Sequence, residues 1–184
     1  MLSSEHGYLR TTEEDDAPYF HALYTAGGPR FATLDLKREP ILPTLMEVRE
    51  TLSSNESARS MFFTLEEPGG VVAGFMCLRG LNQESGYCEV APLMLEEDRV
   101  HEGLAAWALG FVLERAFNVL RLRKVTAHAL CRESSLRQFL LDHDFTCDGA
   151  QREVVHARGR WHDVVCYSRF HPGRMASTEH DACL

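Results

Sequence analysis

The residues from Val100 to Ala105 could bind a phosphate group. They follow an apolar run at 90–95 and open the longest amphipathic stretch of the chain. A strand, a short loop and a helix start leave backbone N–H groups unpaired, and the helix dipole adds partial positive charge there. Gly103 and the small Ala105 would let a ligand approach the backbone closely. An ordinary strand-to-helix connection has the same pattern, so the rest of the chain must decide between the two interpretations.

The composition describes an ordinary globular domain with an acidic balance. Of the 184 residues, 45% are hydrophobic and 25% are charged, and the formal net charge is −8. This charge argues against nucleic acid as the main partner, because phosphate binding requires a basic face. It suits a basic or amine-bearing small substrate, although acidic surfaces usually serve only to keep proteins in solution.

Cysteine and histidine are numerous but show no metal-binding spacing. The six cysteines include no Cys-x-x-Cys pair, and the nine histidines include no His-x-x-x-His pair, so we expect no metal site. The N-terminal residues show no secretory leader, and no apolar run approaches the roughly 20 residues of a membrane span. These features predict a cytoplasmic protein with reduced thiols that does not enter a membrane.

Hydrophobic periodicity and turn signals predict the order of the elements. In chain order we expect a strand at 8–10, a helix that starts within 11–16 and ends at 27–29, a helix at 43–52, strands at 60–65, 71–78 and 87–95, a helix at 103–120, a strand at 124–130, a helix at 134–141 and two strands within 146–170. The strands within 60–95 would form an antiparallel meander, and the helix at 103–120 would connect two parallel strands. Pro92 would remove a ladder hydrogen bond, which predicts a bulge or a splayed edge.

This order of elements resembles the GNAT superfamily of N-acyltransferases. The resemblance covers residues 8–170 and is carried by Leu9 to Asp16, Cys88 to Ala91, Gly103 to Ala105 with its helix, and Ser135 to Phe145. The closest branch includes the ribosomal-protein N-terminal acetyltransferases, whose last hairpin is similar to residues Gly159 to Ser168. Each stretch alone is weak evidence, whereas their order and spacing together are fairly specific for the fold.

The resemblance implies an α+β fold with a mixed central sheet of about six or seven strands, flanked by helices. Most strands would be antiparallel, with one parallel pair that splays apart at an acyl-CoA site. Residues 1–170 would form a single domain, and 171–184, which lack periodicity, would be a flexible tail. By resemblance, the acyl-carrying arm of CoA would lie along Leu93, Met94 and Leu95. Its pyrophosphate would lie on Val100, His101, Glu102, Gly103, Leu104 and Ala105.

Acyl transfer from a thioester to an amine requires removal of a proton from the amine, an oxyanion donor and a proton for the departing thiolate. Glu89 is the first candidate for the base or the amine-orienting carboxylate, and its alternative is a solvent-facing or arginine-paired side chain. Ser135 lies where this branch often has a hydroxyl near the sulfur, but it could equally be a helix cap. Tyr167 and His128 are weaker candidates, since a strand histidine is more often a satisfied core or edge residue.

Two functional classes remain open. The first is an N-acyltransferase that moves an acetyl or other short acyl group from CoA to a primary amine by direct attack. The second is a GNAT-like domain that acts as a non-catalytic binding protein or on a different thioester reaction. Val100, His101 and Arg132 depart from the family motifs and favour the second class, whereas Gly103, Ala105 and the element order favour the first. The acceptor, a small-molecule or peptide amine, is not identified, and the final hairpin could carry a homodimer contact.

Overall fold

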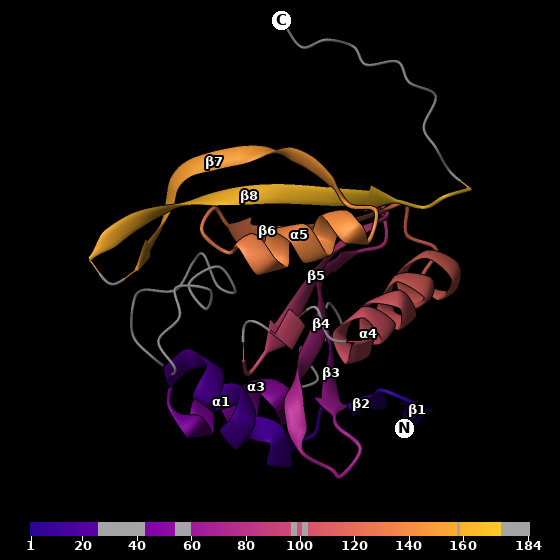
Figure 1. Ribbon diagram of the computed structural model, residues 1–184, viewed down its shortest axis with the longest axis vertical. Coiled ribbons are helices and arrows are strands. Elements are labelled where there is room, and N and C mark those ends of the chain that lie inside the picture. The colour runs from indigo at the N-terminus through magenta and orange to yellow at the C-terminus, as the bar shows by residue number, and fades with distance from the viewer. Residues whose placement is uncertain (26–42, 54–59, 97–98, 101–102, 158, 174–184) are drawn as a thin grey trace, which may run out of the picture.

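The computed structural model of the chain describes residues 1–25, 43–53, 60–96, 99–100, 103–157 and 159–173. Within them, eight strands form one sheet in the order β1-β2-β3-β4-β5-β6-β8-β7 (Figure 1). The β5–β6 pair is parallel, and the other neighbouring pairs of this sheet are antiparallel. The predicted mixed sheet with one parallel pair is therefore confirmed, with eight strands in place of six or seven.

The elements agree closely with the periodicity of the sequence. The strands are β1 (Leu2–Ser4), β2 (Gly7–Thr11), β3 (Met61–Glu66), β4 (Val72–Asn82), β5 (Tyr87–Met94), β6 (Lys124–Leu130), β7 (Thr146–Ala157) and β8 (Arg160–Phe170). The helices are α1 (Ala17–Thr25), α3 (Leu45–Ser53), α4 (Gly103–Glu114) and α5 (Ser134–Asp142), with a 3-10 turn at Glu14–Asp16 before α1 and a π-helical turn at Arg115–Val119 after α4. The end of the first helix, expected at 27–29, and the tail beyond 173 lie outside the described residues. No helix within the described residues is long and apolar enough to cross a bilayer.

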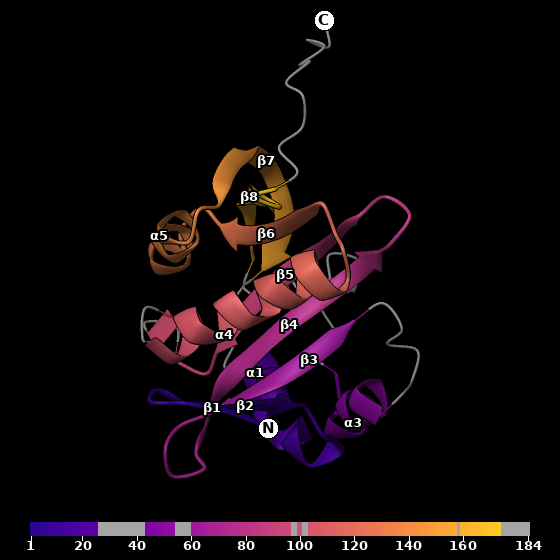
Figure 2. The ribbon, with the colours of Figure 1, turned by 90° about the vertical axis from the view of Figure 1, so that its right-hand side faces the viewer.

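Helices cover both faces of the sheet (Figure 2). The larger core lies on the face covered by α4 and α5, whose buried side chains, such as Leu109 and Phe139, pack among those of the strands. The smaller core lies on the opposite face, where Phe20 of α1 and Val48 of α3 meet Phe75 of β4. Because side chains alternate along a strand, each central strand contributes to both cores.

Asp16 fixes the beginning of α1 to the sheet. Its carboxylate accepts two hydrogen bonds from the Arg10 guanidinium, at 2.6 and 2.7 Å, and one from the backbone N–H of Glu13 at 2.9 Å. The Thr64 hydroxyl lies 3.0 Å from the same carboxylate. Burial raises the pKa of Asp16, but these hydrogen bonds outweigh burial and hold it below its usual value. The Asp16 carboxylate thus reaches back to the backbone N–H of Glu13 and forms a capping box with it at this helix start.

The β5 and β6 strands run side by side over only three residue pairs. The last of these pairs is Glu89 with Thr126. Beyond it, β5 continues along β4 to Met94, and β6 continues along β8 to Leu130, so the two strands part. Pro92 lies in the parted stretch and keeps its register with Met76 of β4. Of the two outcomes expected at Pro92, the splayed edge is therefore confirmed and the bulge is not.

Candidate functional site

Glu89 lies at the residue pair after which β5 and β6 part. Its Oε1 atom accepts a hydrogen bond of 2.6 Å from Nη2 of Arg79, the residue opposite Glu89 in the β4–β5 register. The Nδ1 atom of His128, which lies two residues beyond Thr126 on β6, is 2.9 Å from the same oxygen. Three adjacent strands thus place one carboxylate between a guanidinium and an imidazole.

The partners of Glu89 determine what this carboxylate can do. Burial raises the pKa of Glu89, but the hydrogen bonds from His128 and Arg79 outweigh burial and hold the pKa below its usual value. A carboxylate with a lowered pKa is a weak base and is poorly suited to removing a proton from an amine near neutral pH. It is well suited to orienting the ring of His128 and to stabilising positive charge on it.

His128 has the geometry of a general base. When Nδ1 carries the ring proton and donates it to Glu89, the lone pair of Nε2 is left to accept a proton. The side chain is 27% exposed, so a small substrate can approach the ring. The sequence ranked His128 low because a strand histidine is usually a packing residue. Only the pairing of β5 with β6 places it beside a carboxylate 39 positions earlier in the chain.

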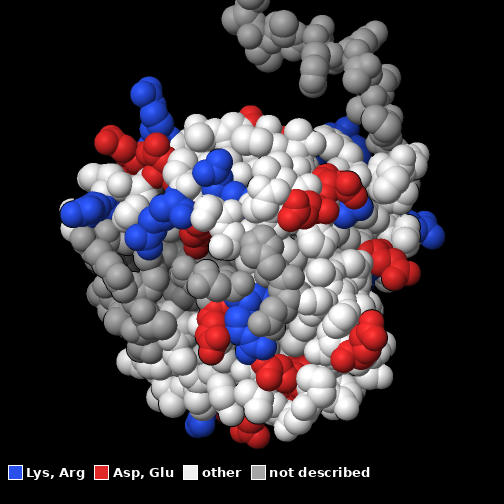
Figure 3. Space-filling model, in the orientation of Figure 1, with Lys and Arg blue, Asp and Glu red and all other residues white. Residues whose placement is uncertain are grey.

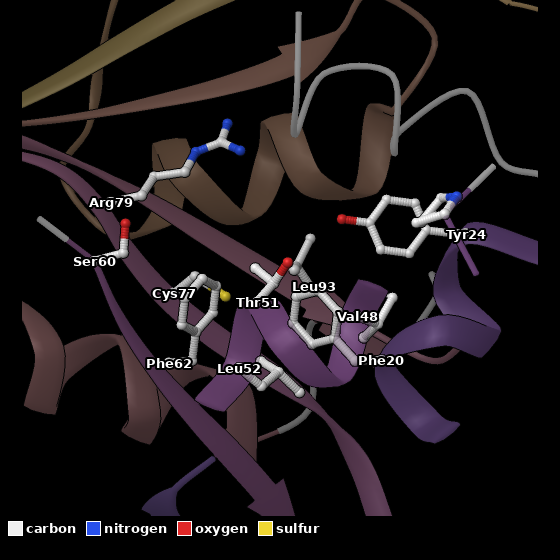
Figure 4. Close-up of a pocket in the computed structure, with 11 residues that line it drawn as sticks. Phe20, Tyr24, Val48, Thr51, Leu52, Ser60, Phe62, Cys77, Arg79 and Leu93 are labelled. Atoms are coloured by element: carbon white, nitrogen blue, oxygen red, sulfur yellow. The ribbon is translucent and has the colours of Figure 1, made fainter. Parts of the chain in front are cut away.

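A pocket of about 220 Å³ opens on the same face of the sheet, beneath α1 and α3 (Figure 4). Its lining comes from these two helices, from β3, β4 and β5, and from Pro43 and Ser60, and consists of Phe20, Tyr24, Pro43, Val48, Thr51, Leu52, Ser60, Phe62, Cys77, Arg79 and Leu93. Figure 4 shows Arg79 and Ser60 at one end of the pocket and Tyr24 at the other. Because Arg79 is also a partner of Glu89, the pocket ends at the point where the strands part.

The three residues expected along the acyl-carrying arm of CoA do not form one wall. Leu93 is buried on the α1 face and lines the pocket, whereas Met94 belongs to the core under α4. Leu95 is half-buried, packs against the smaller core and donates its backbone N–H to Ala73. An extended ligand would therefore meet the backbone edge of β5 that faces the opening between β5 and β6.

The loop at 100–105, which the sequence predicts to bind phosphate, could offer a ligand its backbone groups but not the buried side chains. Val100, Leu104 and Ala105 are buried in the core, so only their main-chain groups could meet a phosphate. His101 and Glu102 lie outside the described residues. Gly103 begins α4, and a Cβ atom placed there would lie 2.6 Å from the His6 ring. His6, which the sequence gave no reason to select, therefore lies against the start of α4, because the β1–β2 turn brings it there.

Ser135 and Glu89 come from different layers of the molecule. Ser135 is half-buried in the first turn of α5, which packs on the α4 side of the sheet, whereas Glu89 faces the α1 side. The structure therefore does not bring the two predicted catalytic side chains together. Tyr167 is 1% exposed, and its hydroxyl accepts a hydrogen bond of 3.1 Å from Nε of Arg137. This contact joins β8 to α5 and makes Tyr167 a packing residue.

The charged surface and the side-chain clusters bear on two further kinds of ligand, nucleic acids and metal ions. On the face shown in Figure 3, acidic and basic side chains are interspersed among the described residues, without a broad basic area for a nucleic-acid backbone. Across the part of the chain that the structure describes, no group of three or more histidine, cysteine, aspartate or glutamate side chains could hold a metal ion.

Comparison with solved structures identifies the fold. No family model and no curated protein matches the sequence. Spermidine N-acetyltransferase from Vibrio cholerae, in complex with CoA and spermine, matches 91% of this chain and 96% of its own, with a TM-score of 0.76 at 18% identity. This chain has the GNAT fold. A probable acetyltransferase matches 91% of this chain and 94% of its own, with a TM-score of 0.73 at 22% identity. A dodecameric form of the Vibrio cholerae enzyme matches 96% of this chain and all of its own, with a TM-score of 0.75 at 18% identity.

The GNAT fold confirms the architecture that the resemblance implied. Identities of this size establish the fold alone, so the ribosomal-protein N-terminal acetyltransferase branch stays a prediction. The roles expected for Glu89, Ser135 and the phosphate-type loop also stay predictions, because they depend on ligands that fold similarity does not place.

Proposed function

We propose that this chain is an acyl-CoA-dependent N-acyltransferase that moves an acetyl or other short acyl group to a primary amine. The observation that carries the proposal is the opening between β5 and β6, with Glu89 and His128 at its narrow end. The GNAT fold supports it, since the matching structures are described as acetyltransferases and one of them is a complex with CoA.

Two backbone surfaces of this chain would hold acetyl-CoA, the proposed co-substrate. Beyond Glu89, β6 no longer pairs with β5, so main-chain groups on this side of β5 could hydrogen-bond to an extended arm that contains amides. The first turn of α4, beginning at Gly103, offers backbone N–H groups to the pyrophosphate. The acyl group would then lie in the gap, near Glu89.

Direct transfer needs only two proton movements. The amine nitrogen attacks the thioester carbonyl, so an N–C bond forms, the C–S bond breaks and the electron pair leaves on sulfur. Nε2 of His128 accepts the proton that the amine loses, and Glu89 stabilises the resulting imidazolium through Nδ1. The Ser135 hydroxyl is our candidate donor to the thiolate, and it would regain its proton from solvent.

The test is a calorimetric titration with acetyl-CoA and with free CoA, followed by an assay of thiol release with a set of amines. We expect binding in the micromolar range and thiol release that depends on the amine. Absence of binding at millimolar ligand would exclude the proposal. Binding of acetyl-CoA without release by any amine would instead support a non-catalytic GNAT-fold binding protein, the alternative that His101 and Arg132 favour.

The remaining proposals concern the domain bounds, the cellular compartment and the oligomeric state. We propose that residues 1–170 form one domain and that the protein works in the cytoplasm. All five cysteines in the described residues are free, as expected in a reducing compartment. We also retain a homodimer contact through the β7–β8 hairpin as a proposal, because β7 is the edge strand of the sheet and Trp161 beside it is 60% exposed.

A further inference from the structure

We infer that the acceptor is a primary amine on a compact apolar body, such as one aromatic ring or a branched chain, and not a polyamine. This inference rests on the proposed function, because it assigns the pocket beside Glu89 to the amine substrate. The supporting observations are the lining of that pocket, its size, its charge and its connection to Glu89.

The lining is mainly apolar and partly aromatic. The rings of Phe20 and Phe62 meet edge to face, with centroids 5.8 Å apart, and Phe20 meets Phe75 in the same way at 4.9 Å. Leu93 and Val48 complete the middle of the pocket (Figure 4). Burial of apolar ligand area against such a surface contributes about 25 cal/mol per Å² before the costs of association.

The volume fits a small body. An apolar cavity of about 150 Å³ holds one benzene molecule. The pocket, at about 220 Å³, therefore has room for one ring with a short aminoalkyl chain, or for a branched aliphatic chain of similar size.

The charge of the lining disfavours a polyamine. Among the described lining residues, Arg79 is the one charged side chain, and none is a carboxylate. Against these described residues, each additional ammonium group of a polyamine would lose water and meet no carboxylate in the lining, which is costly. The Vibrio cholerae enzyme is described in complex with spermine. We therefore expect this chain to differ from that enzyme in acceptor.

Arg79 connects the pocket to the reacting groups. It lines one end of the pocket and donates to Glu89, whose other partner is His128. An apolar body between Phe20 and Leu93 would direct its amine towards this end.

Two bisubstrate analogues test the inference. In each, CoA is joined through an acetyl bridge to an amine, 2-phenylethylamine in one and spermidine in the other, and dissociation constants are measured by calorimetry beside that of free CoA. We expect the phenylethyl analogue to bind at least 10-fold more tightly than the spermidine analogue and than free CoA. A phenylethyl arm that adds no affinity over free CoA, or a spermidine arm that adds more, would overturn the inference.

A matched pair of α3 variants supplies an independent readout. Thr51 and Ser53 are both exposed, and each hydroxyl donates to the backbone carbonyl four residues earlier, but only Thr51 lines the pocket. Thr51→Glu should raise kcat/KM for spermidine relative to 2-phenylethylamine at least 10-fold, because it adds a carboxylate to the pocket. Ser53→Glu should leave the ratio unchanged. Equal ratios in both variants would contradict the assignment of the pocket.

The two proposals fail in different ways. If acetyl-CoA binds and spermidine is the better acceptor, the acyltransferase proposal stands and the inference about the acceptor is wrong. If acetyl-CoA does not bind, the acyltransferase proposal fails and the inference fails with it.

Discussion

Glu89 accepts hydrogen bonds on one oxygen from two side chains of different character, and this arrangement separates orientation from proton transfer. The guanidinium of Arg79 keeps the carboxylate charged, while the imidazole of His128 has an atom left to accept a proton. A carboxylate alone in an apolar site would have a raised pKa and could itself be the base. In our proposal Glu89, whose pKa is lowered, therefore positions His128 and does not act as the base.

Substitution of either member of this pair should lower turnover by different amounts. His128→Ala should reduce kcat by 10²- to 10⁴-fold, the typical contribution of a general base. Glu89→Gln should reduce kcat less, because the His128 ring loses the carboxylate that orients it but keeps a nitrogen that can accept a proton. Acetyl-CoA affinity, measured by calorimetry, should stay near that of the unmodified protein in both variants.

His156, whose ring lies 5.0 Å from that of Trp161 in the β7–β8 hairpin, provides the control for these variants. His156→Ala should leave kcat unchanged. A fully active His128→Ala variant would remove the base assignment, and a fully active Glu89→Gln variant would show that Glu89 does not position the base.

Single residues were the least predictable part of this molecule. Glu89 could be selected because its strand precedes the expected splay, and that choice depends only on neighbours in the sequence. His128 was ranked low and His6 was not selected, since each acquires its neighbour through tertiary pairing. The pocket that we propose for the acceptor was equally hidden, because its lining comes mainly from five elements and no local pattern unites them.

Gly74 of β4 lies close to the backbone of β5, opposite Met94. A Cβ atom there would lie 2.5 Å from the backbone oxygen of Leu93 and 2.9 Å from Cα of Met94. These are backbone atoms and cannot move aside as a flexible side chain can. The glycine therefore sets the path of β5 in the stretch that faces the gap.

Gly74→Ala should destabilise the protein by about 1–3 kcal/mol, the usual cost of forcing an extra carbon atom into a packed site. Gly110→Ala is the matched control, because Gly110 lies on the exposed side of α4 with no atom within 4 Å of an added Cβ. It should stabilise the protein by about 0.5–1 kcal/mol through helix propensity. Urea unfolding measures both values, and equal effects would contradict the close approach.

Elements were predicted better than residues because their signals are local. The apolar spacing of α4 and the turn at 66–70 carry enough information in the chain itself. β1 was missed, since three residues, two of them serines, show no alternation. The strand count was therefore low, and the part of the sheet that carries the predicted site was not affected.

The whole molecule should respond to acetyl-CoA as a ligand that binds only the folded state. At a free concentration 100 times its dissociation constant, such a ligand adds about 2.7 kcal/mol to the free energy of unfolding. Thermal unfolding with and without acetyl-CoA measures this gain. Gly103→Val should abolish most of this gain, because the added side chain collides with the His6 ring and displaces the start of α4, where the pyrophosphate would bind. An equal gain in that variant would exclude the loop as the binding site.

The short contact between β5 and β6 has a consequence for how the fold holds together. Three residue pairs join a five-stranded part, β1 to β5, to a three-stranded part, β6 to β8. Proteins open locally along their weakest boundaries before they unfold globally. The larger core under α4 and α5 includes side chains from both parts and holds them together where the ladder does not. A thioester lying between β5 and β6 would add contacts across this boundary, so the substrate itself would strengthen the joint that the backbone ladder leaves short.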